Sequence, residues 1–589
     1  MSNITLTIDN VQVVVPKGTT VLEAARQAHV RIPTLCFLKD LNEIGACRMC
    51  VVDAGGRTLQ PACVLEAGDG MVVRTNTPQV REARKVILEL ILSNHDKKCL
   101  SCVRSQNCEL QKLSLELGVE NGDEFEGKRN EYEVDDKSPS IVRDNNKCIL
   151  CRRCVAACYK TQAVGVIGPV KRGFDTAIAS PWDLPLNSMA CIACGQCIAA
   201  CPVGALREKE AAPQVWKWLN DPAKHVVVQT APAVRAALGE EFGLPMGTNV
   251  TGKMVAALRR LGFDQVFDTD FAADLTILEE ATELVSRIKG GGVLPLITSC
   301  SPGWVNFCET FYPEFLPNLS TCKSPHEMLG ALIKSYYAEK ADIPLRNIVV
   351  VSVMPCTAKK IEAGRSQLAA LGVADVDAVI TTRELARMIK SNGINILTLA
   401  DEPFDSLLGD STGAATLFGV TGGVMEAALR TAYETLTGES LQDVDFHAVR
   451  GLDAVKEADI NIGDMTLRVA VAHGTANAKT LLDEIKAGRK TYDFIEIMGC
   501  GGGCVDGGGQ PFVSAETRTH SDPRVVRARA LYQADLAMTH RKSHENPGVQ
   551  RLYSEFLGEP NSKKAHYLLH THYARQPKYR QNRESADAQ

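Results

Sequence analysis

The sequence lacks features that would direct it to a membrane or out of the cell. Residues 1–5 carry no basic segment leading into an apolar one, so no secretory signal is predicted. We find no uninterrupted apolar run of about 18 residues, so no membrane span is predicted. We therefore expect a cytoplasmic location.

The sequence also gives no basis for binding a nucleic acid or a nicotinamide cofactor. The net charge is −5 and no basic run is present, which gives no reason to expect a nucleic-acid partner. No G-x-G-x-x-G fingerprint is found, so any nicotinamide chemistry is expected to belong to a partner subunit.

Cysteine is what the chain has in excess, with 21 among 589 residues. Most fall in short repeated spacings, which in a chain without a predicted signal indicate metal sites rather than disulfides. The length predicts several domains.

Residues 1–78 are predicted to form a small β-rich domain that holds a metal. Segments 4–8 and 11–15 alternate around a turn, which predicts a hairpin, and 20–29 has helical spacing. Four thiolates at C-x10-C-x2-C-x12-C suit a 2Fe–2S cluster, with a zinc site as the alternative. The ligands would be Cys36, Cys47, Cys50 and Cys63.

Residues 79–125 combine a predicted helix at 80–92 with a mixed ligand set. The H-x3-C-x2-C-x5-C pattern comprises His95, Cys99, Cys102 and Cys108. Imidazole is a competent metal ligand, so an iron–sulfur cluster with one histidine ligand is predicted. A zinc site, or His95 as a surface residue, is the alternative.

Residues 139–210 repeat the two-cluster pattern of bacterial ferredoxins. In that arrangement the fourth cysteine of each run serves the other cluster, so two 4Fe–4S clusters are predicted, with zinc as the weaker alternative. One would be held by Cys148, Cys151, Cys154 and Cys201, and the other by Cys191, Cys194, Cys197 and Cys158.

Residues 211–224 are predicted to be a linker, and 225–540 an α/β domain. The predicted strands are 225–228, 292–297 and 347–353, and the predicted helices are 254–261 and 278–288. Cys308 and Cys322 match no motif and are predicted to be buried thiols. Residues 541–589 are predicted to be a C-terminal segment with a disordered tail from 576.

Three cysteine motifs are predicted to follow strands of the α/β domain, where such folds place their sites. They are TSCSPGW at 298–304, MPCTAKK at 354–360 and MGCGGGCVDGGGQP at 498–511. In order and spacing they resemble the signature motifs of the iron-only (FeFe) hydrogenases. The resemblance runs over about residues 1–575. It implies a multidomain α/β protein with an N-terminal β-grasp ferredoxin-like domain, a one-His three-Cys domain, a two-cluster ferredoxin-like domain and a large H-cluster domain.

The resemblance implies an H-cluster, which is a 4Fe–4S cube joined to a diiron unit that carries CO, cyanide and an azadithiolate bridge. By position Cys356, Cys500 and Cys504 match cube ligands, with Cys504 as the bridging one. Lys359 matches a lysine that hydrogen-bonds a cyanide. The residues matching the cluster's surroundings are Pro232, Met354 and Met498.

The first motif departs from the commonest family form, Thr-Ser-Cys-Cys-Pro. Cys300 aligns with a proton-relay cysteine and Ser301 with the fourth cube ligand. Two alternatives remain open here. Either the Ser301 oxygen is the ligand, although a hard oxygen suits iron–sulfide less well than thiolate, or Cys300 is the ligand and the relay differs.

A proton route is also implied by the resemblance. Glu280 and Glu283 lie three apart on a predicted helix and therefore on one face. They match relay carboxylates, with Ser320 between them and Arg287 at the surface end.

The function implied is reversible heterolytic cleavage of H2 to protons and electrons. One 2Fe–2S and three 4Fe–4S clusters would relay electrons to a ferredoxin or to flavin- and NAD(P)-binding iron–sulfur subunits, and maturation proteins would supply the H-cluster. The rival interpretations are a hydrogen sensor, an electron-wire subunit like that of respiratory NADH dehydrogenase, and an iron–sulfur assembly protein.

Overall fold

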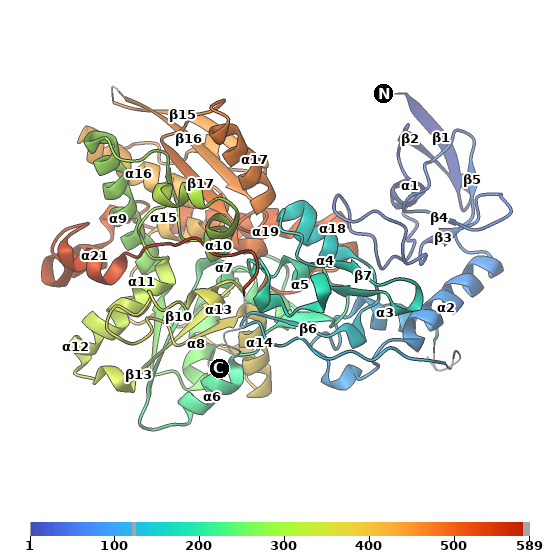
Figure 1. Cartoon of the computed structure of the whole chain (residues 1–589), viewed down its shortest axis with the longest axis horizontal. Helices are drawn as coiled ribbons and strands as arrows, with labels where there is room; N and C mark the ends of the chain where they lie inside the picture. The colour runs from blue at the N-terminus through green and yellow to red at the C-terminus, as the bar shows by residue number, and fades with distance from the viewer. Residues whose placement is uncertain (1, 120–124, 126, 464, 581–589) are drawn as a thin grey trace.

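The computed structural model describes residues 2–119, 125, 127–463 and 465–580. The molecule is extended in one direction (Figure 1). The N-terminal strands lie at one end, residues 139–210 lie in the middle, and two larger sheets form the other end. None of the described helices combines the length and apolar character that crossing a membrane would need.

The N-terminal domain is a sheet of order β2-β1-β5 with a helix against it. Its elements are β1 (Asn3–Ile8), β2 (Val11–Pro16), α1 (Val21–Gln27), β3 (Val51–Val52), β4 (Gln60–Pro61) and β5 (Val72–Val73). Asp9 and Asn10 both have left-handed φ, as a tight hairpin turn requires. Thr20 begins α1 by accepting a hydrogen bond from the Glu23 amide. The predicted hairpin and helix are confirmed.

The middle region consists of short elements that surround cysteine loops. They are α2 (Pro78–Ser93), α3 (Glu109–Glu116), β6 (Ile141–Arg143), α4 (Arg153–Ala156), β7 (Gly168–Val170), β8 (Ala177–Ala179), α5 (Gln196–Ala200) and β9 (Leu206–Glu208). The internal repeat is visible in the backbone. Leu150 and Arg152 in the first run, and Ala193 and Gly195 in the second, flank the middle cysteine with left-handed φ.

The largest region contains two four-stranded sheets. The first has the order β11-β10-β13-β14 and is parallel throughout, and the second has the order β12-β17-β16-β15. Their strands are β10 (His225–Thr230), β11 (Gln265–Asp268), β12 (Leu296–Ile297), β13 (Ile348–Met354), β14 (Ala378–Thr381), β15 (Val455–Ile462), β16 (Met465–His473) and β17 (Phe494–Met498). Strand β13 is buried along its whole length, which fits a parallel strand covered on both faces.

Helices cover both sheets. The longest, α9, packs against α11 and α16, and it carries the predicted relay carboxylates. The principal helices are α8 (Thr251–Leu261), α9 (Thr269–Gly290), α10 (Pro302–Phe311), α11 (Pro325–Leu332), α14 (Thr382–Ser391), α16 (Gly423–Thr437), α17 (Thr475–Lys486), α19 (Pro523–Ala537), α20 (Pro547–Leu552) and α21 (Lys563–Leu569).

Three local predictions were wrong. The predicted linker contains helix α6 (Ala212–Leu219), because its apolar side chains pack against the core of the first sheet. The predicted strand 292–297 is reduced to β12, since Val293 is half exposed. The tail is ordered through Arg580, whose amide donates to the Ser188 carbonyl at 2.9 Å. Residues 581–589 lie outside the described part of the chain.

Candidate active site

The three cysteine motifs converge because each follows the carboxyl end of a strand. Strand β13 of the first sheet leads into the second motif, and β12 and β17 of the second sheet lead into the first and third. Carboxyl ends of neighbouring parallel strands meet at one edge, which is where α/β folds place their sites. The site therefore lies between the two sheets.

A cavity occupies this position, and it gathers residues that are far apart in the sequence. The predicted site residues that line it are Pro232, Cys300, Ser301, Met354, Cys356, Lys359, Met498, Cys500 and Cys504. Phe418 and His326 line it as well. The lining is largely apolar, with cysteine thiols and one lysine as its reactive groups.

Glycines allow the third motif to fold tightly over the cavity. Gly503 has φ of +95°, and a Cβ there would stand 2.7 Å from the Thr421 amide nitrogen. A Cβ on Gly507 would stand 2.2 Å from the Pro355 carbonyl oxygen. Neither position has room for a side chain, so the glycine run is required for this approach.

The thiols of the cavity fit an iron–sulfur group. Burial raises the pKa values of Cys356, Cys500 and Cys504, that of Cys504 to about 12. Their thiolates are therefore unfavourable unless a cation compensates the charge, which bound metal does. Several soft sulfur donors in an apolar cavity are the donor set that iron–sulfur clusters use.

Lys359 places a fixed positive charge at the cavity. Its Nζ donates to Glu362 Oε2 at 2.9 Å and to the Cys300 carbonyl at 3.3 Å. Burial opposes the charge, but Glu362 more than offsets it, so the pKa of Lys359 is raised. His326 Nε2 contacts the same Glu362 oxygen at 2.8 Å. The ammonium is suited to an anionic ligand in the cavity.

The neighbouring residues Cys300 and Ser301 have different surroundings. Ser301 Oγ accepts a hydrogen bond from the Gly499 amide at 3.0 Å, next to Cys500. Burial raises the pKa of Cys300, whose thiol feels the charges of Glu280 and Lys359. The serine therefore faces the third motif, and the cysteine faces the helix that carries the carboxylates.

A line of polar side chains runs from Cys300 toward the surface along α9. Burial raises the pKa of Glu280 to about 8, and the nearby Ser320 hydroxyl acts in the opposite direction. Ser320 Oγ donates to Glu283 Oε2 at 3.3 Å, and Arg287 Nη2 lies 2.5 Å from Glu283 Oε1. Glu280 Oε2 has no hydrogen-bond partner among the described residues. The structure thus joins Ser320, Glu283 and Arg287 by hydrogen bonds, and it places Glu280 within electrostatic reach of Cys300.

The four cysteines of the N-terminal domain also lie together. The Cys36 amide donates to Cys47 Sγ at 3.3 Å, and the Cys63 thiol lies close enough to Cys36 and Cys50 to influence their titration. Asn42 connects this site to the next one, because its Nδ2 donates to the carbonyls of Cys36 and Cys151, at 2.7 and 3.0 Å.

His95 is buried, and one nitrogen of its imidazole ring is unpaired within the described part of the chain. Burial lowers its pKa to about 4, so the imidazole is neutral as a metal ligand must be. Its Nδ1 finds no hydrogen-bond partner in the part of the chain that the structure describes. An orphaned buried nitrogen of this kind fits a role as a metal ligand.

The two runs of the middle region pair across each other. Cys148, Cys151, Cys154 and Cys201 line one cavity, so the last cysteine of the second run joins the first run. Cys158 in turn lies within electrostatic reach of Cys191, Cys194 and Cys197. This is the crossed arrangement that the sequence predicted.

These sites form a continuous series that ends at the central cavity. Cys102 Sγ lies close to Gly204, beside Cys201. Cys154 and Cys197 are electrostatic neighbours, which connects the two middle sites. Cys194 interacts with Cys356 and Cys500 of the cavity.

Some residues of the site were not found from the sequence. Glu362 lies three positions after Lys359, and this helical spacing could have indicated the pair. His326 and Gln196 gave no signal, because their contacts with the cavity residues depend on the fold.

Comparison with known proteins decides the family. The chain is 50% identical over 587 residues to a subunit of an NADP-reducing hydrogenase from Solidesulfovibrio fructosivorans, and the match covers 97% of this chain and 99% of that one. The chain belongs to the iron-only hydrogenases. It is also 43% identical to iron hydrogenase 1 of Clostridium pasteurianum, again over 97% of this chain and 99% of that one.

The family models and a solved structure match the same regions. The C-terminal domain of the iron-only hydrogenase large subunit matches residues 224–508, and the iron hydrogenase small subunit matches 521–576. A 2Fe–2S domain, an iron–sulfur region of NADH-ubiquinone oxidoreductase and a 4Fe–4S dicluster domain match 1–78, 84–123 and 147–205. An [FeFe]-hydrogenase variant from Chlamydomonas reinhardtii superposes with a TM-score of 0.56 at 44% identity, covering 62% of this chain and 99% of that chain. The protein is thus a hydrogenase with an H-cluster domain and accessory iron–sulfur domains.

Proposed function

We propose that Cys356, Cys500 and Cys504 hold the cube of the H-cluster in this hydrogenase, with Cys504 as the bridge to the diiron unit. The observation that carries this proposal is the meeting of all three motifs at one largely apolar cavity. When bound, the H-cluster supplies the iron at which H2 is split. Lys359 holds an anionic ligand of the cluster in place, and Pro232, Met354 and Met498 form its walls.

Cys300 is the residue that passes the proton, and Ser301 takes the fourth position at the cube. The different surroundings of the two side chains support this division, since Cys300 feels the charges of Glu280 and Lys359. Ser301 Oγ is held beside Cys500 by the Gly499 amide.

Protons travel between Cys300 and solvent through Glu280, Ser320 and Glu283 to Arg287. Hydrogen-bond contact is the geometry that proton transfer needs, and the contacts from Ser320 outward measure 3.3 and 2.5 Å. The raised pKa of Glu280 suits a group that both accepts and releases a proton near neutral pH.

Electrons travel through four accessory clusters, one 2Fe–2S and three 4Fe–4S. Sixteen predicted ligands precede residue 202, which is four for each cluster, and the sites follow one another toward the cavity. The corresponding domains are proposed at 1–78, 79–125 and 139–210, followed by the catalytic domain at 225–540 and a small-subunit-like segment at 541–589.

The partners proposed are flavin- and NAD(P)-binding iron–sulfur subunits of a larger complex, with ferredoxin as the alternative. The similarity to a subunit of an NADP-reducing hydrogenase supports this choice. The chain is placed in the cytoplasm, because most of its cysteines have the spacings of metal ligands, and a reducing compartment keeps such thiols from forming disulfides.

Infrared spectroscopy of the chain produced together with maturation proteins tests the assignment. Bands of CO and cyanide are expected. H2 uptake is also expected when a dye serves as the electron acceptor. The isolated chain should not reduce NAD(P), and NAD(P) reduction without flavin subunits would contradict the partner proposal. A protein with full H2 turnover and no such bands would contradict the H-cluster assignment.

A further inference from the structure

One buried asparagine joins the N-terminal domain to the middle region. Asn42 lies in the loop between the proposed ligands Cys36 and Cys47, and it is 2% exposed. Its Nδ2 donates to the Cys36 carbonyl at 2.7 Å and to the Cys151 carbonyl at 3.0 Å. An amide NH2 group has two hydrogens, so one nitrogen serves both acceptors. The two acceptors belong to proposed ligands of different clusters.

The backbone of this asparagine is fixed on the N-terminal domain. The Asn42 amide donates to the Leu38 carbonyl at 2.7 Å, and the Leu38 amide donates to the Asn42 carbonyl at 3.0 Å. These two bonds close the loop on itself, and Asp40 between them has a left-handed φ of +62°. The side chain is therefore the part of Asn42 that reaches the middle region.

Apolar packing brings the two regions together around this contact. Leu35 and Met49, which lie beside proposed ligands of the N-terminal domain, are fully buried. They belong to one apolar cluster with Cys154 and Cys201 of the middle region. The hydrophobic effect is non-directional, so this packing does not by itself fix which backbone groups face one another. The Asn42 amide supplies that direction, because without it two carbonyl oxygens would face each other with no donor between them.

Two other polar contacts link the N-terminal domain to the rest of the molecule and reach no proposed ligand. Lys160 Nζ donates to the Leu41 carbonyl at 2.8 Å. Arg31 Nη1 lies 2.9 Å from Glu116 Oε2. Both cations are exposed, so water weakens these contacts. Of the three contacts, that of Asn42 holds the backbone of a proposed ligand on each side.

We propose that Asn42 is a positioning residue for electron transfer, which holds the ligand loop of the 2Fe–2S site against that of the first 4Fe–4S site of the middle region. The step that it serves moves one electron between the two sites and makes or breaks no covalent bond. The rate of such a step falls steeply as the distance between the two sites increases. A side chain that holds both ligand loops therefore controls the rate. The inference rests on the proposed cluster assignments.

The test follows the reduction of each cluster by freeze-quench EPR after the oxidised, maturated chain is mixed with H2. In Asn42→Leu the side chain has no donor, and in Asn42→Asp it has at most one hydrogen, and only when protonated. In both variants the 2Fe–2S signal should appear several-fold more slowly than in the wild type, with the larger delay in Asn42→Leu. The first 4Fe–4S site should be reduced at the wild-type rate.

Two further readouts separate positioning from a general loss of structure. In the fully reduced chain the magnetic interaction between the two clusters should weaken in both variants. The iron content and the g values of each cluster should stay as in the wild type, because neither variant changes a ligand. Asn42→Asp also serves if the leucine variant does not fold.

Lys160→Met is the matched control, because it removes a contact between the same two regions, at the residue next to Asn42, without reaching a ligand. Its 2Fe–2S signal should appear at the wild-type rate. Wild-type kinetics and magnetic interaction in both Asn42 variants, or an equal delay in Lys160→Met, would overturn the inference. Failure of the proposed function is distinguishable from this, since the wild type itself would then lack the 2Fe–2S signal.

Discussion

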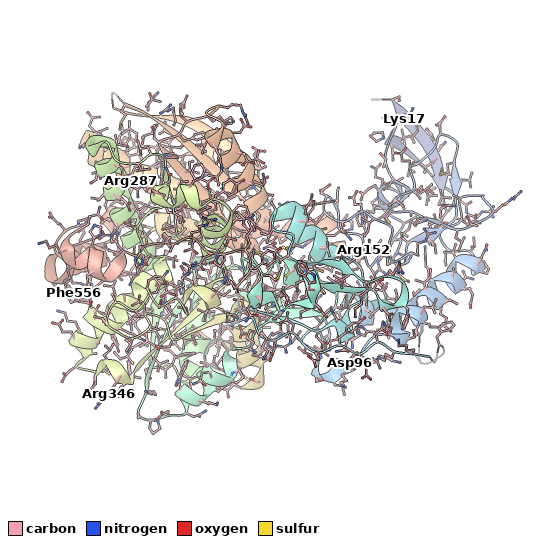
Figure 2. All side chains as sticks on the ribbon, viewed as in Figure 1. Lys17, Asp96, Arg152, Arg287, Arg346 and Phe556 are labelled. Carbon is pink, nitrogen blue, oxygen red and sulfur yellow. The ribbon has the colours of Figure 1, made fainter. Side chains whose placement is uncertain are left out.

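The proposed proton route and the proposed electron route of this hydrogenase, its proton side and its electron side, are built in different ways. On the proton side Glu280, Glu283 and Arg287 lie on one helix, α9, and Ser320 bonds Glu283 and lies near Glu280. On the electron side the predicted ligands lie mostly in short loops, where left-handed residues turn successive cysteines toward one point. The outer parts of the two routes lie far apart, as Arg287 and Asp96, the neighbour of His95, show in Figure 2.

This difference follows from what each route carries. A proton moves only between groups in hydrogen-bond contact or joined by one water, so each group in the series is necessary. An electron passes between clusters without such a continuous series of contacts. Substitutions on the proton side should therefore stop turnover while leaving metal content intact, and substitutions at ligands should reduce metal content.

The largest effect is expected where the two proposed routes meet inside the protein, at Cys504. Cys504→Ser should abolish diiron attachment and all turnover while the N-terminal clusters remain, because a thiolate is needed to bridge two metal units. Infrared bands and iron content measure this. Cys308→Ala is the control, since it removes a fully buried thiol that does not line the cavity. Bands that persisted in Cys504→Ser would refute the bridging role.

Cys300→Ala should keep the CO and cyanide bands and lose turnover by roughly 10²–10⁴-fold, the loss typical of a missing proton-transfer group. Ser301→Ala should instead reduce cluster content, and Ser301→Cys should be tolerated. The measurements are infrared spectra, iron content and H2 uptake.

Opposite results for the two alanine variants would reverse the roles assigned to Cys300 and Ser301. If Cys300→Ala lacked the cube while Ser301→Ala were fully active, Cys300 would be the ligand and belong to the electron side.

Glu280→Gln should lose turnover while gaining stability. The pKa of Glu280 is raised from 4.5 to about 8 by burial. Between these values the folded protein holds a proton that the unfolded chain has lost, so the free energy of unfolding falls as pH rises. Glutamine does not titrate, so the variant should be more stable than the wild type at pH 8 by roughly 2–5 kcal/mol.

Thermal melting at pH 5 and pH 8 measures this difference, which should shrink toward pH 5. If the difference in stability between the wild type and Glu280→Gln did not change with pH, Glu280 would not hold its proton in the folded state.

The smallest effect is expected at the outer end of the relay. Arg287 also donates to the Leu319 carbonyl at 2.9 Å, and water can replace part of its function near the surface. Arg287→Ala should therefore reduce turnover by only about 3–10-fold, below the range for an inner proton-transfer group. Lys289→Ala, an exposed cation on the same helix, should have no effect on turnover. Equal losses in both variants would indicate a general effect of surface charge.

The two sides also differ in how far the sequence predicts them. The electron side was predictable in detail, because cysteines such as Cys191, Cys194 and Cys197 lie close together in the chain and their spacing is specific. The proton side depended on the family resemblance, since two glutamates on a helix usually indicate only a solvated face.

Contacts between distant segments could not be predicted at all. Gln162 bonds Gly499 across 337 positions and Gln196 bonds Asp506 across 310, and only the fold brings them together. The helix within residues 212–219 was missed for a similar reason. Its apolar side chains are stabilised by the core of the first sheet, which a short local pattern does not reveal.

Exchange of hydrogen between H2 and D2O tests most directly whether the two routes are separate. This exchange needs heterolytic cleavage and a proton route to solvent, but no net removal of electrons. Glu280→Gln should lose the exchange while keeping its infrared bands. His95→Ala should lose the iron of one accessory cluster and keep the exchange at the wild-type rate. Exchange that survived in Glu280→Gln, or that disappeared equally in both variants, would contradict the separation.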